Sequence, residues 1–127
     1  MGSYFLLKAT DRDYDAQTRL ELIHRKDEDQ LYEKFDENRH KETNEFEKET
    51  REEWEQALAD FARKFEMGQA NHKHKDDLIK QLTITREKKL ETLHSRRKER
   101  ERHLTMELLD RQAKEMMDLH KKYRTSA

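Results

Sequence analysis

The chain has 127 residues, of which 45% are charged and 31% hydrophobic, with a net charge of -1 and no cysteine or proline. A globular domain usually has about 45–50% apolar residues, so this composition argues against a chain that buries a large core. Helix-forming residues dominate and the net charge is small, which favours α-helix over disorder. No apolar run is long enough to predict a membrane-spanning helix. The lack of cysteine fits a reducing compartment, and a cytoplasmic location is expected.

Residues 1–9 are expected to form an N-terminal lead-in that begins with a remnant of an expression tag. Residues 10–66 are predicted to form an acidic helical arm, with 12 basic and 19 acidic side chains over residues 1–66. Residues 67–72 form a candidate turn, because Gly68 and Asn71 tolerate left-handed backbone geometry.

Residues 73–125 are predicted to form a basic helical arm. The chain from residue 67 onward carries 16 basic and 10 acidic side chains, so the near-neutral total conceals two halves of opposite charge.

Apolar side chains recur at helical spacing along both arms, and several steps are 11 residues long, as from Leu20 to Leu31. A single helix cannot bury such a stripe, so the stripe is predicted to be a helix–helix interface. The predicted interface residues are Leu20, Leu31, Phe35, Phe46, Trp54, Leu58, Phe61, Phe65, Leu78, Leu82, Leu90, Leu93, Leu104, Leu108, Met116 and Leu119.

The apolar blocks, the intervening polar block and the net charge all reflect about one point between Gln69 and Ala70. The reflection predicts antiparallel pairing of the two arms, because a parallel in-register dimer would stack like charges on each other. It also predicts charge pairing across the interface, of Glu37 with Arg102 and of Glu42 with Arg97.

Two architectures satisfy this pairing within an all-α fold of long antiparallel coiled-coil type. In the first, the chain turns at residues 67–72 and forms an αα-hairpin. In the second, a continuous helix pairs antiparallel with a second chain. Gly68 favours the turn. The 11-residue stripe that includes Ala57, Gly68 and Ile79 nevertheless stays in phase through the turn region, which favours the continuous helix.

A second apolar row lies beside the main stripe and would stay exposed in a simple two-helix pair. Such a pair buries little core, so a homodimer is expected under either architecture, and pairing of two hairpins would give a four-helix bundle. The second row consists of Ile23, Tyr32, Ile79, Leu109 and Met117.

The sequence offers no phosphate-binding loop, nucleophile motif or metal-ligand set, so no enzyme activity, cofactor or metal is predicted. The expected function is a dimerisation and scaffolding module within a larger protein, such as a signalling enzyme or a cytoskeletal linker. The expected partners are a second copy and other helical proteins.

As an alternative, the basic arm docks on an acidic filament or an anionic membrane through residues 96–102. Two glutamates interrupt this stretch and no aromatic side chain interleaves with it, which argues against nucleic acid.

Overall fold

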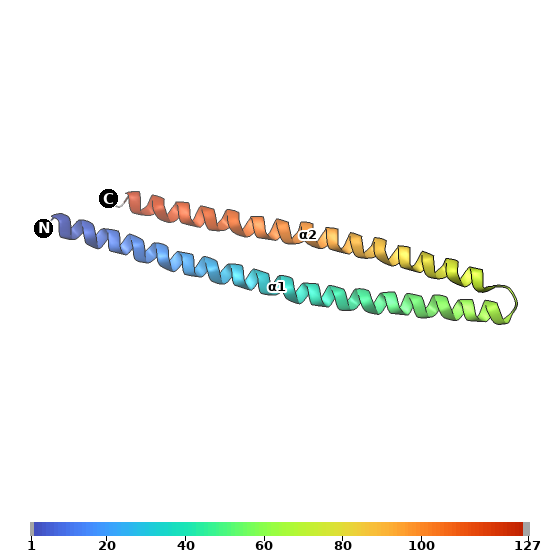
Figure 1. The fold of residues 1–127 in the computed structure, drawn as a ribbon. Coiled ribbons are helices and arrows are strands. Elements are labelled where there is room, and N and C mark those ends of the chain that lie inside the picture. Colours follow the sequence, from blue (N-terminus) through green and yellow to red (C-terminus); the bar gives the residue numbers. More distant parts are fainter. Residues whose placement is uncertain (1, 126–127) are drawn as a thin grey trace. The chain divides into compact units, whose positions relative to one another are not determined.

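The structure, a computed structural model, describes the backbone of residues 2–125 and the side chains of residues 14–124. Two helices, α1 (Gly2–Glu66) and α2 (His72–Thr125), are joined by a short connection (Figure 1). Residues 2–125 contain no strand, and neither helix carries an apolar stretch that could span a membrane. The predicted all-α antiparallel fold is confirmed, and of the two predicted architectures the structure adopts the helical hairpin.

Helix α1 begins earlier than the sequence analysis predicts. The prediction places the start of the acidic arm at residue 10, whereas the helix starts at Gly2. The early segment contains no proline, and Leu6, Leu7 and Ala9 are good helix formers, so nothing in it interrupts the helix. The first residue of the predicted tag remnant, Met1, lies outside the described residues.

The C-terminus of α1 is closed by a Schellman motif centred on Gly68. This glycine has a φ of +74°, in the left-handed region that side chains with a Cβ atom rarely adopt. Its amide donates to the carbonyl of Phe65 at 3.1 Å, and the Gln69 amide donates to the carbonyl of Lys64 at 2.8 Å. These two bonds are the ones that define the motif, and they satisfy carbonyls that the ended helix leaves without partners.

The N-terminus of α2 carries a reciprocal cap made by Asn71 and His74. The Asn71 side-chain oxygen accepts from the His74 amide at 3.1 Å, and the His74 Nδ1 atom accepts from the Asn71 amide at 3.0 Å. This arrangement is a capping box in which histidine replaces the usual glutamate or glutamine. The short connection between the helices therefore ends one helix and starts the next.

The chain divides into two units, which we describe separately. Unit 1 comprises Met1–Asp36 and Glu101–Ala127, and unit 2 comprises Glu37–Arg100. Unit 2 is a hairpin that contains the connection between the helices. In unit 1, the N-terminal part of α1 runs antiparallel beside the C-terminal part of α2 (Figure 1).

Candidate functional site

Most of the predicted interface residues are half-buried. Phe35 is buried, and it is the only hydrophobic residue below 9% exposure among side chains 14–124. Phe65 and Leu104 are exposed, at 44% and 37%. A side chain in a two-helix seam has one neighbouring helix, so solvent reaches it from the flanks. The half-buried predicted residues are Leu20, Leu31, Phe46, Trp54, Leu58, Phe61, Leu78, Leu82, Leu90, Leu93, Leu108, Met116 and Leu119.

Aromatic contacts occur in both units. In unit 1, the ring centroids of Tyr32 and Phe35 are 6.2 Å apart in an edge-on arrangement. In unit 2, the Phe65 ring lies 6.0 Å from Phe61 and 5.3 Å from the His72 ring. The last contact joins the end of α1 to the start of α2, so Phe65 packs at the connection although it is partly exposed.

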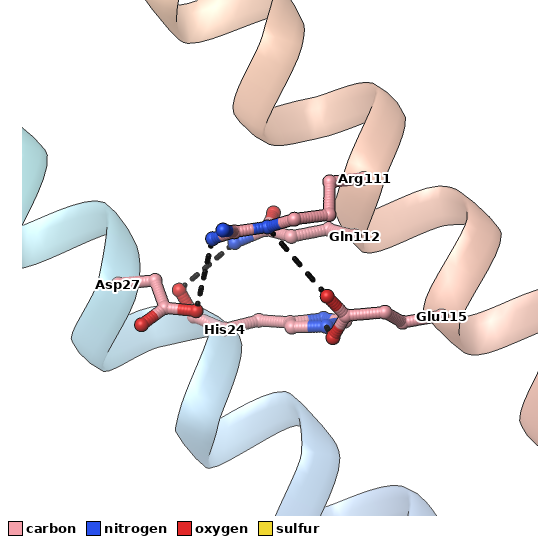
Figure 2. A network of polar contacts seen from close by, with 5 residues as sticks. All are labelled: His24, Asp27, Arg111, Gln112 and Glu115. Atoms are coloured by element: carbon pink, nitrogen blue, oxygen red, sulfur yellow. Dashed lines mark hydrogen bonds and ion pairs between the residues drawn. The ribbon is translucent and has the colours of Figure 1, made fainter.

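A layer of polar side chains crosses the seam of unit 1 (Figure 2). His24 and Gln112 are both buried, at 8% and 7% exposure. The His24 Nε2 atom lies 3.0 Å from the Glu115 Oε2 atom, and the Gln112 side chain donates to the His24 carbonyl at 3.0 Å. Because a carboxylate only accepts, the Nε2 atom carries the shared hydrogen. Buried polar groups cost free energy unless they are satisfied, and here each finds a partner on the opposite helix.

Arg111 extends this polar layer toward solvent. Its Nη2 atom lies 3.4 Å from the Asp27 Oδ2 atom, and its Nε atom lies 3.6 Å from the Glu115 Oε1 atom (Figure 2). The apolar pattern of the sequence does not predict this layer, because its side chains are polar. A usable signal was present, since the reflection that pairs the arms also places His24 opposite Glu115.

One predicted charge pair needs correction. Glu42 forms its ion pair with Arg100 and not with Arg97, which is half-buried. Side chains on a helix lean toward its N-terminus, so facing side chains of antiparallel helices lean in opposite directions. These opposite leans bring Arg100 to Glu42, three residues beyond the position that the predicted reflection pairs with Glu42. Lys89 and Glu53, which meet at 2.7 Å, have the same offset.

The second predicted charge pair does not form. Glu37 and Arg102 are both exposed, and within the part of the chain with described side chains they make no ion pair with each other. The prediction assumed that every charged side chain that faces the other arm forms an ion pair with it. An ion pair between solvent-exposed side chains, however, contributes little free energy.

The residues of the predicted second apolar row lie mostly on the surface but do not form one row, because Ile23 and Tyr32 are nine residues apart and project from opposite sides of α1. Ile23, Tyr32, Leu109 and Met117 are between 50 and 72% exposed, whereas Ile79 is half-buried. An open groove in unit 1 is lined by apolar side chains, including Ile23 and Leu119, together with charged ones. The seam and these surfaces are the features available for binding a protein partner.

No described group of three or more histidine, cysteine, aspartate or glutamate residues is arranged to hold a metal ion. The seven histidines of the sequence are instead dispersed. His24 belongs to the polar layer, His74 caps α2 and His72 contacts Phe65, while the exposed His103 pairs with Glu107 one turn away.

Two known proteins are similar to this chain. It is 36% identical over 120 residues to Hillarin of Drosophila melanogaster, an alignment that covers 83% of this chain and 15% of Hillarin. It is 70% identical over 36 residues to the Lim and transglutaminase domain protein ltd-1 of Caenorhabditis elegans, or 28% of this chain and 5% of that protein. No family model and no solved structure matches the chain. The chain thus resembles a short part of each of two larger proteins.

Proposed function

We propose that this chain is a non-catalytic helical module for dimerisation and scaffolding within a larger protein. In this role it sets the oligomeric state of its host and the spacing of the domains attached to it. A second copy is the proposed first partner, and other helical proteins are further partners. The proposed location is the cytoplasm, which the absence of cysteine from the sequence supports.

The observation that carries the proposal is the thin core of the hairpin. A single hydrophobic residue is buried among side chains 14–124, while large apolar side chains remain on the surface of both units. A pair of helices with so little buried apolar area is weakly stabilised alone, and packing against further helices would bury more. The similarity to short parts of Hillarin and ltd-1 supports a module that serves a larger host.

Light scattering on the purified chain tests the proposal. A dimer has twice the 15.6 kDa mass of the chain, and apolar association predicts that this mass persists when the salt concentration is raised. A monomer at all concentrations up to about 1 mM, where binding free energies fall to about 4 kcal/mol, would contradict dimerisation.

The alternative function is docking of the basic arm on an acidic filament or an anionic membrane. The exposed side chains of Arg96, Lys98 and Arg102 on α2 favour it. Screening makes such docking sensitive to salt, because the Debye length falls to about 3 Å at 1 M. Co-sedimentation with phosphatidylserine vesicles or with microtubules that disappears by about 0.3 M salt supports docking. Dimerisation without any co-sedimentation supports the scaffold.

A further inference from the structure

Five large apolar side chains of unit 1 are exposed to solvent. Each is between 50 and 72% exposed. Two come from α1 and three from α2. We name this set the tyrosine–methionine face, and it consists of Tyr14, Tyr32, Met106, Leu109 and Met117.

The α1 members of the face lie opposite the open groove of unit 1. Nine residues span two and a half turns of an α-helix, so side chains nine positions apart point in opposite directions. Tyr14 and Tyr32 are each nine residues from Ile23, and Ile23 lines the groove. Both tyrosines therefore project from the flank of α1 that faces away from the groove.

The α2 members lie on the same side of unit 1 as the tyrosines. Asp118 and Glu115 line the groove, and Leu109 and Met106 precede them by nine residues. Met117 follows Met106 by 11 residues, or about three turns, and so projects in a similar direction. One side of unit 1 therefore carries the groove, which apolar and charged side chains line together, and the other carries the tyrosine–methionine face.

Charge identifies the surface that fits this face. In unit 1 the α1 segment has a net charge of -3 and the α2 segment +1, and in unit 2 the corresponding values are -4 and +5. In each unit the α1 strip is thus acidic, whereas the α2 strip beside it is nearly neutral in unit 1 and basic in unit 2. A partner with the same two strips in the opposite lateral order would avoid placing acidic strips on each other, and a second copy of the chain carries these strips.

Two symmetric ways of stacking a second copy on the face differ in their charge contacts. A two-fold axis parallel to the helices places α1 of one copy on α2 of the other, so the acidic α1 strips do not meet each other. A two-fold axis perpendicular to the helices, within the plane of the interface, places α1 on α1 and α2 on α2. Opposed like charges are destabilising, so the charge pattern selects the parallel axis.

We propose that a second copy of the chain covers the tyrosine–methionine face, with α1 of each copy packed against α2 of the other about a two-fold axis parallel to the helices. This inference rests on the proposed dimerisation and assigns it a surface and a symmetry. In the four-helix bundle that this packing forms at unit 1, all neighbouring helices are antiparallel. The opposite side of unit 1, with its groove, stays open to solvent.

Matched charge substitutions test the surface. Tyr32→Glu and Leu109→Glu introduce a carboxylate at the covered face, so each should raise the dimer dissociation constant at least about tenfold. Ile23→Glu is the control, because Ile23 has 55% exposure against 54% for Tyr32 but lies on the groove side. The control should leave the dissociation constant within about twofold. Circular dichroism verifies that all three variants keep their helix content.

Sedimentation equilibrium of the full chain separates the outcomes. A wild-type monomer would contradict both the proposed function and this surface. A wild-type dimer that Tyr32→Glu and Leu109→Glu leave intact, or that Ile23→Glu disrupts equally, would overturn the surface alone while dimerisation stands.

Cysteine cross-linking tests the symmetry, since the chain contains no cysteine of its own. Tyr32→Cys and Leu109→Cys are prepared as separate chains of different length and mixed under mild oxidation. The parallel axis predicts more cross-linked product between the two variants than within either one. Predominant self-cross-linking of Tyr32→Cys would favour the perpendicular axis and contradict the proposed packing.

Discussion

His24 of α1 and Glu115 of α2 meet across the seam of unit 1, with 3.0 Å between the Nε2 and Oε2 atoms. The contact joins residues 91 positions apart in the sequence, and the buried Gln112 lies beside it. Two helices with an apolar seam can change their register with little change in buried area. The hydrogen bonds of a polar layer, by contrast, form in one register only. The layer therefore acts as a register mark for the two helices of unit 1.

Loss of the Glu115 carboxylate should destabilise the hairpin. Glu115→Ala leaves the buried His24 ring without its acceptor and removes a partner of Arg111, so we expect a loss of about 1–2 kcal/mol in unfolding free energy. Urea denaturation followed by circular dichroism measures it. Glu107→Ala is the control, because its contact with His103 is exposed and lies within one helix, and its expected effect is below about 0.5 kcal/mol. Equal effects of the two substitutions would contradict the register role.

Gly68→Ala should destabilise the chain through its backbone alone. The left-handed φ of +74° disfavours a Cβ atom, yet no atom lies within 4 Å of where that Cβ would stand. We expect a cost of about 1 kcal/mol from strain without a clash. Gly68→Asn, whose side chain tolerates this conformation, should cost less. A thermal melt compares the two, and a more stable alanine variant would indicate a continuous helix at this position.

The cap of α2 predicts a graded response at Asn71. Asn71→Ala removes the acceptor for the His74 amide and should cost about 1 kcal/mol. Asn71→Ser and Asn71→Asp supply another acceptor and should retain most of the stability. Denaturation midpoints measure the series, and a loss that is the same for all three substitutions would show that the side-chain oxygen is not what matters.

Phe35 should be the most sensitive apolar position of the seam. It is the buried hydrophobic residue among side chains 14–124, and Phe35→Ala removes its contact with Tyr32 as well as its buried area. We expect a loss of about 3–4 kcal/mol. Ile84→Ala, at a position with 51% exposure, should change stability by no more than about 0.5 kcal/mol. The prediction fails if the two variants unfold at the same urea concentration.

The sequence predicts the broad architecture because its signals are repetitive. Helix propensity, the apolar stripe and the reflection of charge each extend over many residues, so single exceptions do not obscure them. The choice between hairpin and continuous helix depends on far fewer residues. Gly68 favours the hairpin through its left-handed backbone conformation, and Asn71 favours it through the cap of α2. Together these two residues contribute only a few hydrogen bonds.

Individual side-chain partners are harder to predict than the register of the helices. Glu42 meets Arg100 and not Arg97, because the two side chains lean in opposite directions and together span an offset of three residues. His24 and Gln112 escaped notice because polar side chains in a seam produce no hydropathy signal. Their burial follows from their position on the side of each helix that faces the other helix. The apolar stripe indicates that side only indirectly.

The central claim, that α1 and α2 pair antiparallel within one chain, is tested most directly by a distance measurement. Spin labels on Arg19→Cys and Lys122→Cys in one chain, diluted with unlabelled protein, report only the intrachain distance. Both positions line the same groove of unit 1. Packed helix axes lie about 8–10 Å apart, so the predicted label separation is roughly 10–25 Å. A continuous helix would separate the labels by about 150 Å, and the absence of any short distance would contradict the hairpin.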